Sequence, residues 1–263
     1  MATGVKREEG GIWETVKTIF WALIIAGVFR TLFFQPFWIP SGSMKDTLLI
    51  GDFLFVNKMA YGYSSYSCPF GICPIEGRIL ASEPRRGDVV VFRHPTQGVD
   101  FIKRLIGLPG DRVQMKDGIL WLNGQQVPTV PAGDFVEKME RQGGAQQFPN
   151  CYNRPVAEGG DCIKQRFTET LPGGVSHDVL NIADDWVADN TPEFVVPAGH
   201  YFFMGDNRDN SMDSRFDPRE RGVGMVPAEY LIGRADRIMF SSAGKSLLYF
   251  WTWRADRFLK AVH

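Results

Sequence analysis

The feature that most constrains the fold is an apolar segment close to the N-terminus. Residues 18–29 (TIFWALIIAGVF) carry no charged side chain, and after Arg30 the apolar character resumes. A helix that crosses a bilayer needs about 20 mainly apolar residues. A helix from Ile12 to Phe34 reaches that length if its few charged side chains lie near the headgroups. Because the segment has almost no polar face, we predict a membrane-spanning helix rather than a buried core helix.

A cleavable signal peptide and an uncleaved anchor both begin with such a segment. A signal peptide ends in a small-x-small cleavage pattern, whereas Phe, Gln and Pro follow here. The pattern favours an uncleaved signal anchor over residues 11–35, with Pro36 and Pro40 ending the helix. A cleavable signal peptide is the alternative.

The charges around the segment predict its orientation. Lys6, Arg7 and Lys17 outnumber Arg30 near the membrane, and positively charged flanks tend to stay in the cytoplasm. We therefore expect residues 1–10 to form a cytoplasmic tail and the remainder to lie outside the cytoplasmic membrane.

Four cysteines fit an oxidising location. Cys68 and Cys73 flank PFGI, while Cys151 and Cys162 flank a Gly-rich loop. Neither pair has Cys-x-x-Cys zinc spacing, and no histidine cluster accompanies them. We predict a local disulfide within each pair, with the turn-like sequence favouring the second. Free thiols are the alternative.

Beyond the apolar segment, β signals dominate. Asp117-Gly118 and Asn123-Gly124 are strong turn signals between short apolar runs. The predicted strands cover residues 52–56, 88–93, 101–106, 112–116, 119–122, 200–204 and 234–240. Helical signal is confined to short stretches near residues 135–141 and 253–260. The predicted fold is mostly β, with an N-terminal transmembrane helix followed by a β-rich core and an inserted smaller β-subdomain.

Composition suggests where the insertion lies. Residues 128–192 are richer in Gly, Asn and Asp and contain the second cysteine pair, so we interpret them as the inserted β-subdomain. The core then comprises residues 36–127 and 193–263.

A formal net charge of −1 gives no large field of one sign, so nucleic acid is not an expected partner.

The turn after the apolar segment is the first candidate for chemistry. The sequence IPSGSM at residues 39–44 combines a proline of fixed φ with a glycine of unusual freedom. Such a turn can expose the hydroxyl of Ser43. The Ser43 N–H and the Ser41 hydroxyl could both point at a developing oxyanion. Because Ser-Gly-Ser is common in loops, this nucleophile still needs a base.

Lys103 is the candidate base. It lies in a predicted strand, where alternate side chains share a face, so Phe101, Lys103 and Leu105 should point the same way. Apolar neighbours disfavour the charged amine and lower its pKa, as a lysine general base requires. The neighbouring Arg104 cannot serve, because a guanidinium stays protonated. The non-catalytic alternative is a strand lysine whose amine reaches solvent.

A third polar cluster, GDNRDNSMDSR at residues 205–215, follows the apolar run YFFM. A charged loop after a buried strand is a common place for a site. Asp213 and Arg215 could pair and brace this loop, and Ser211 could orient a lysine amine. The Asp-rich sequence also suggests calcium. However, the ligand spacing fails and arginines intrude, so we predict no metal.

A Ser-His-Asp triad is the competing enzymatic interpretation. The histidines are His94, His177, His200 and His263, and no Gly-x-Ser-x-Gly elbow is present. His200 precedes a predicted strand and suits a structural hydrogen bond. The sequence therefore favours a serine hydrolase whose base is a lysine.

Together these segments resemble bacterial type I signal peptidases, also called leader peptidases, of the peptidase S26 family. The resemblance is carried, in order, by IPSGSMKDTLLIGDFLFVNK, RRGDVVVFRHP, DFIKRLIGLPGDRV and GDNRDNSMDSR. It implies a β-rich catalytic core with a second, more variable β-subdomain. It also implies a membrane-bound serine endopeptidase that removes N-terminal signal peptides from exported preproteins after a small-x-small site, often Ala-x-Ala.

The resemblance also implies individual roles. Ser43 would be the nucleophile and Lys103 its general base. The supporting roles would fall to Ser41 in the oxyanion hole with the Ser43 N–H, to Ser211 beside the lysine, and to the ion pair of Asp213 and Arg215. Shallow apolar pockets for the two small substrate side chains would be lined by Phe37, Ile39, Pro40, Met44, Leu48, Phe101 and Ile102.

Two departures from the family pattern concern the pocket more than the reaction. Asp46 stands where proline is usual, and Phe101 where tyrosine is frequent.

The implied partners are preproteins with signal peptides and the lipid bilayer, with no cofactor. The implied location is the cell inner membrane, with a single pass and a periplasmic catalytic domain.

Three other functions compete with this interpretation. A self-cleaving repressor would need a DNA-binding domain and no anchor, which is the reverse of this chain. A dedicated conjugation-system peptidase with the same dyad and a non-enzymatic, membrane-tethered periplasmic binding module stay open.

Overall fold

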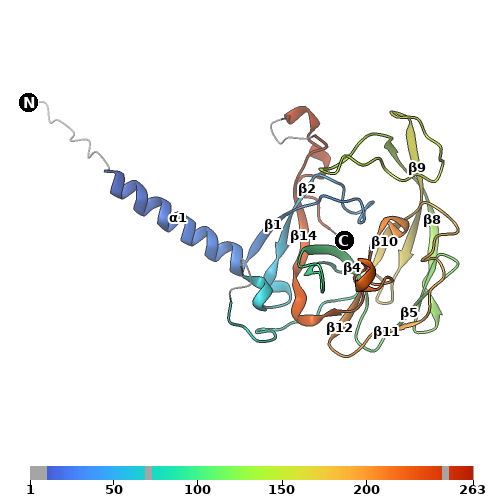
Figure 1. Ribbon diagram of the computed structural model, residues 1–263, viewed down its shortest axis with the longest axis horizontal. Coiled ribbons are helices and arrows are strands. Elements are labelled where there is room, and N and C mark those ends of the chain that lie inside the picture. Colours follow the sequence, from blue (N-terminus) through green and yellow to red (C-terminus); the bar gives the residue numbers. More distant parts are fainter. Residues whose placement is uncertain (1–10, 69–72, 245–248, 263) are drawn as a thin grey trace, which may run out of the picture.

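A long N-terminal helix projects away from a body built of β-strands (Figure 1). The computed structural model describes residues 11–68, 73–244 and 249–262. The predicted tail, with Lys6 and Arg7, lies outside the described residues. Helix α1 (Ile12–Leu32) has no buried residue and a mean hydropathy of 1.6 over its most apolar stretch. By length and composition it could cross a membrane.

The helix passes into the β body almost without a linker. It ends at Leu32, before either proline predicted to end it, and β1 (Phe34–Trp38) begins two residues later. The Tyr63 hydroxyl donates to the Leu32 carbonyl at 2.6 Å and helps to fix the junction. Pro36 lies inside β1, which is an edge strand, where a missing N–H is tolerated.

The largest sheet has seven strands in the order β1-β2-β14-β3-β4-β12-β13. Its further members are β2 (Asp52–Asn57), β3 (Val89–Arg93), β4 (Asp100–Gly107), β12 (His200–Met204), β13 (Val226–Pro227) and β14 (Leu231–Ser241). All its neighbouring strands are antiparallel. The sheet therefore brings residues from both ends of the chain around β4.

A four-stranded sheet packs beside it in the order β11-β5-β6-β7. Its strands are β11 (Phe194–Val195), β5 (Arg112–Lys116), β6 (Ile119–Leu122) and β7 (Gln125–Gln126). Asp117 and Gly118 both have positive φ, at 49° and 73°, as the predicted β5–β6 turn requires. Ile106 and Phe202 of the large sheet share a core cluster with Val113 and Leu120, which joins the two sheets.

The third sheet has the order β10-β9-β8 and lies on the side of the body away from α1 (Figure 1). Its strands are β8 (Thr129–Lys138), β9 (Asp161–Thr170) and β10 (Ser176–Asn181), all within the region interpreted as an insertion. The prediction of helix near residues 135–141 is wrong, because β8 extends through Lys138 and pairs with β9. Pairing with a distant strand outweighs the weak local preference.

The C-terminal helical prediction is also wrong in kind. Residues 253–260 contain no α-helix; single 3-10 turns occur at Phe250–Thr252 and Ala255–Arg257.

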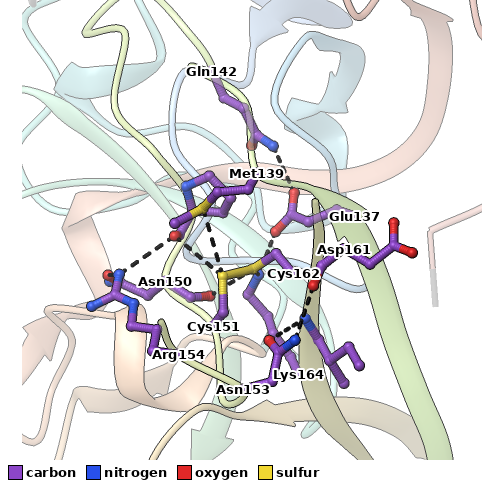
Figure 2. Close-up of a disulfide and its surroundings, with 12 residues drawn as sticks. Glu137, Met139, Gln142, Asn150, Cys151, Asn153, Arg154, Asp161, Cys162 and Lys164 are labelled. Carbon is purple, nitrogen blue, oxygen red and sulfur yellow. Dashed lines mark hydrogen bonds and ion pairs between the residues drawn. A yellow bond between two sulfur atoms is a disulfide. The ribbon is translucent and has the colours of Figure 1, made fainter. Parts of the chain in front are cut away.

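Both predicted cysteine pairs are disulfides, Cys68–Cys73 and Cys151–Cys162. The second joins the segment after β8 to the start of β9 (Figure 2).

Candidate active site

Ser43 and Lys103 meet although they come from separate parts of the fold. Ser43 lies in the turn between β1 and β2, and Lys103 lies in β4. The Lys103 Nζ donates a hydrogen bond to the Ser43 Oγ at 2.5 Å. The residues are 4% and 7% exposed, so the contact is largely shielded from water. A nucleophile and its base need this proximity.

The strand geometry explains why Lys103 is buried. Phe101 and Leu105 pack in the core cluster on its face of β4, and Val90 is its partner across the β3–β4 pair. The Lys103 Nζ lies 5.5 Å from the centroid of the Phe101 ring. Alternation in a strand and an apolar neighbourhood therefore combine to desolvate this amine.

Burial lowers the pKa of the Lys103 amine to about 8. The carboxylates of Asp213 and Asp206 favour the ammonium and oppose this shift, while the Arg215 guanidinium adds to it. A lysine with a pKa near 8 has a substantial neutral fraction at mildly alkaline pH and can accept a proton there.

The turn that carries Ser43 is held by its carbonyl groups. Asn207 donates from its backbone N–H to the Ser43 carbonyl at 3.1 Å and from its side chain to the Gly42 carbonyl at 2.9 Å. In the described chain the Ser43 N–H has no hydrogen-bond acceptor. The exposed Ser41 hydroxyl lies 3.5 Å from the Ser43 Oγ. The Ser43 N–H and the Ser41 hydroxyl thus both lie beside the Ser43 Oγ, where an oxyanion site would need its donors.

The loop after β12 contains the predicted ion pair. Arg215 contacts both carboxylate oxygens of Asp213, with its Nε at 2.9 Å and its Nη2 at 3.0 Å. Asp213 also accepts the Gly205 N–H at 3.0 Å. The guanidinium offsets the effect of burial and lowers the pKa of the Asp213 carboxyl. The loop is therefore braced by a charged pair that is shielded from water.

The predicted contact of Ser211 with Lys103 is a different case. Within the described residues these two side chains form no hydrogen bond. The buried Ser211 hydroxyl instead interacts with the Asp213 carboxyl and helps to lower its pKa, although the geometry of that contact falls short of a hydrogen bond. The hydroxyl does lie near the site. A Cβ placed on Gly205 would be 2.3 Å from the Ser211 Oγ and 2.5 Å from the Ser43 carbonyl oxygen. Gly205 thus lets the loop approach the turn between β1 and β2 that carries Ser43, called the nucleophile turn below. The sequence did not reveal this requirement.

Sequence reasoning also missed a buried pair next to Lys103. Arg104 and Asp206 are 0% and 1% exposed and form a bidentate pair at 2.8 and 2.7 Å. The Thr47 hydroxyl donates to the same carboxylate at 2.6 Å. These contacts join β4, the loop after β12 and the nucleophile turn. Strand alternation was the available signal: if Lys103 faces one side, Arg104 faces the other and needs an acidic partner.

The predicted pocket residues fall into different environments. Ile39, Met44 and Leu48 are 2%, 1% and 0% exposed and share a core cluster against which Ile102 packs. Phe37 packs with Ile102 in a neighbouring cluster. Of the other two, Phe101 is half-buried in the cluster on the Lys103 face, and Pro40 is exposed. Of the predicted pocket residues, those with accessible surface are therefore Phe37, Pro40, Phe101 and Ile102.

The described histidines have other roles. His94 is buried, and its Nδ1 accepts the N–H groups of Thr96 and Gln97 at 3.2 Å each, which fixes a turn. His177 is buried, and burial lowers its pKa to about 4. His200 contacts a backbone carbonyl at 3.0 Å. None of the three hydrogen-bonds Ser43, and within the described residues no cluster of three His, Cys, Asp or Glu could hold a metal ion.

Known proteins resemble the chain over most of its length. A family model described as "Signal peptidase, peptidase S26" matches residues 12–240. A signal peptidase I of Rickettsia typhi is 40% identical over 243 residues, which cover 87% of this chain and 82% of that protein. One from Rickettsia canadensis is 39% identical over 235 residues, covering 86% and 79%. A crystal structure of a signal peptidase I from Enterococcus faecalis aligns with a TM-score of 0.30 at 25% identity, covering 58% of this chain and 97% of that one. The chain belongs to the signal peptidase family, peptidase S26, and is a hydrolase of that family.

Proposed function

We propose that the protein is a membrane-bound serine endopeptidase in which Ser43 and Lys103 form the catalytic dyad. It removes N-terminal signal peptides from exported preproteins after a small-x-small site such as Ala-x-Ala. The observation that carries the proposal is the 2.5 Å hydrogen bond between the Ser43 hydroxyl and a buried amine whose pKa is lowered to about 8. Family membership supports the same reaction class.

In the proposed reaction, the neutral Lys103 amine accepts the Ser43 proton while the Ser43 Oγ attacks the carbonyl carbon of the scissile bond. The Ser41 hydroxyl and the Ser43 N–H stabilise the oxyanion. The lysine then donates its proton to the leaving amine, which becomes the N-terminus of the mature protein. After that step the neutral amine activates a water that hydrolyses the acyl-enzyme and restores Ser43.

The strand edges near the dyad suit an extended substrate. β12 pairs with β4 only from Arg104 to Gly107, so residues 100–103 pair on one side alone, with β3. β1 is at the end of its sheet. A peptide lying along these edges can form backbone hydrogen bonds while its small side chains contact the half-buried apolar surface beside Ser43.

A membrane location completes the proposal. Helix α1 would anchor the protein in the cell inner membrane with its N-terminus in the cytoplasm and its catalytic region in the periplasm. Tyr249, Phe250, Trp251 and Trp253 are 45%, 66%, 69% and 43% exposed. Exposed aromatic side chains favour the membrane–water interface, so this group would bring the site close to emerging signal peptides.

Cleavage of a detergent-solubilised preprotein, followed by N-terminal sequencing of the product, tests the function. Wild-type protein should yield a new N-terminus directly after the small-x-small site, while Ser43→Ala and Lys103→Ala should yield none. Lys103→Arg should also be inactive, because a guanidinium cannot accept the proton. Cleavage by any of these folded variants would refute the dyad. A wild type that cleaves no Ala-x-Ala peptide would point to the dedicated conjugation peptidase or the binding module.

A further inference from the structure

The nucleophile turn makes a polar contact with the three-stranded sheet through Lys45. Lys45 lies two residues after Ser43 and is 4% exposed. Its Nζ donates to the Glu137 carboxylate at 2.6 Å and to the Gln142 side chain at 2.7 Å. Its Cε lies 3.2 Å from the point where a Cβ on Gly42 would be, so its stem packs under the turn. One side chain thus contacts both the backbone around the nucleophile and the neighbouring sheet.

Glu137 is itself held from within that sheet. Lys164 of β9 donates to its other carboxylate oxygen, and the same amine lies 3.5 Å from the Cys162 Sγ of the disulfide. Figure 2 shows Glu137 beside Gln142, close to the Cys151–Cys162 bond. Burial would raise the pKa of the Glu137 carboxyl, but the two ammonium groups lower it, so it is anionic at neutral pH. The acceptor for Lys45 is therefore fixed in position and in charge.

A second ion pair of opposite polarity lies next to the first. Asp46 accepts from the Arg166 Nη1 of β9 at 3.3 Å, and Arg166 also donates to the Ala132 carbonyl of β8 at 3.0 and 3.2 Å. Two successive residues of the turn, one positive and one negative, thus meet complementary partners on one sheet.

The contact of Lys45 with Glu137 and Gln142 borders a space that side chains do not fill. A cavity of about 370 Å³ is lined by Lys45, Leu49 and Ile50 of the turn, by residues 135–138 and 140–143, and by Ala243 and Arg254 near the C-terminus. Apolar packing alone therefore does not hold the turn against the sheet here. The hydrogen bonds of Lys45 to Glu137 and Gln142 therefore add a constraint at a place where packing is incomplete.

We propose that Lys45 and Asp46 are positioning residues that clamp the Ser43 turn to the three-stranded sheet and so set the attack geometry of the hydroxyl. The inference rests on the proposed function for its kinetic consequence. Without the clamp, the turn should sample more orientations while the substrate-binding edges of β1 and β4 are unchanged. The rate of acylation then falls and the affinity for substrate does not.

The experiment compares full-length variants in detergent with the same preprotein. Lys45→Met removes the amine and leaves Glu137 paired with Lys164, and we expect kcat to fall about tenfold with KM unchanged. Lys45→Arg should retain most of the rate. The control is Lys138→Met, because Lys138 forms an ion pair with Asp161 at 2.7 Å on the same two strands, at 60% exposure for both side chains. Its kcat and KM should match those of the wild type.

Amide hydrogen exchange of residues 41–50 gives a readout that does not depend on activity. It should be faster in Lys45→Met and Asp46→Asn than in the wild type and unchanged in Lys138→Met. A wild-type kcat in Lys45→Met, a rise in KM alone, or an equal loss in the control would overturn the clamp. If the wild-type protein cleaves no preprotein, the proposed function fails, and unchanged exchange in Lys45→Met would then refute the clamp separately.

Discussion

Two adjacent basic residues of β4 lie in contrasting electrostatic environments. Lys103 and Arg104 are both almost fully buried, but they point to opposite faces of the strand. The lysine meets an apolar face and a hydroxyl, so its charge is disfavoured. The arginine forms an ion pair with the carboxylate of Asp206. The chemistry of each residue follows from the face on which the strand places it.

The pH dependence of cleavage should report the Lys103 amine. Its pKa is lowered by burial to about 8, and in the proposed mechanism the neutral form is the active one. We therefore expect kcat/KM to rise about tenfold per pH unit below pH 8 and to level off above it. Initial rates of peptide cleavage across pH 5.5 to about 10 measure this profile. A plateau that is already complete near pH 6 would show that another group is the base.

Gly205 should be intolerant of any side chain. In Gly205→Ala the new Cβ would lie 2.3 Å from the Ser211 Oγ and 2.5 Å from the Ser43 carbonyl oxygen, so the nucleophile turn must shift. We expect a loss of at least about 100-fold in kcat/KM, because small displacements of reacting groups are costly. Gly144→Ala is the matched control, since nothing lies within 4 Å of its added Cβ. Near wild-type kinetics in Gly205→Ala would contradict the close approach.

At the scale of elements, the sequence predicted those strands whose own residues form an apolar run or an alternating pattern that ends in a turn. The β5–β6 hairpin follows from Asp117-Gly118 between alternating apolar residues, and β4 and β12 follow from apolar runs that end in turns. β8 was missed because its sequence, TVPAGDFVEK, contains Pro and Gly and lacks regular alternation. Only its pairing with β9, at a distance along the chain, makes it a strand.

The candidate site likewise contains some features that local sequence predicts and others that it does not. Ser43 and Lys103 could be proposed from residue type, local spacing and family resemblance. The contact of Arg104 with Asp206 depends on the register between β4 and β12, across a separation of 102 residues. Lys45 meets Glu137 across a separation of 92 residues. Such contacts form between elements whose relative placement no local pattern encodes, so the sequence alone did not reveal them.

The Cys151–Cys162 disulfide should contribute to the stability of the three-stranded sheet. It closes a loop with a sequence separation of 11 and joins the segment after β8 to the start of β9. In Cys151→Ser/Cys162→Ser we expect the free energy of unfolding to fall by about 2–3 kcal/mol, because the unfolded chain regains loop entropy. Denaturant unfolding in detergent, with and without reductant, measures the change. An unchanged midpoint would mean that strand pairing alone secures the sheet.

At the scale of the whole molecule, acid should destabilise the protein before most carboxylates titrate. His177 is buried, its pKa is lowered to about 4, and Glu169, Asp206, Arg104 and Arg208 surround it. The unfolded chain binds this proton near pH 6.5, so the folded state loses stability as the pH falls from about 6.5 to 4. One histidine shifted this far costs about 3 kcal/mol at the acid end.

Denaturant unfolding at successive pH values in this range checks the prediction. His177→Leu removes the titrating group, so its free energy of unfolding should change less with pH than that of the wild type. Equal pH dependence in the two proteins would assign the acid sensitivity to other groups.

The direct passage from α1 into β1 limits the reach of the nucleophile. Ser43 follows Leu32 by eleven positions in the chain, and a fully extended chain covers at most about 3.5 Å per residue. With α1 embedded in a bilayer, the hydroxyl therefore stays within about 40 Å of the helix end. If α1 anchors the protein as proposed, a scissile bond close to the lipid surface should be cleaved, and one held far from the surface by a long, rigid spacer should not.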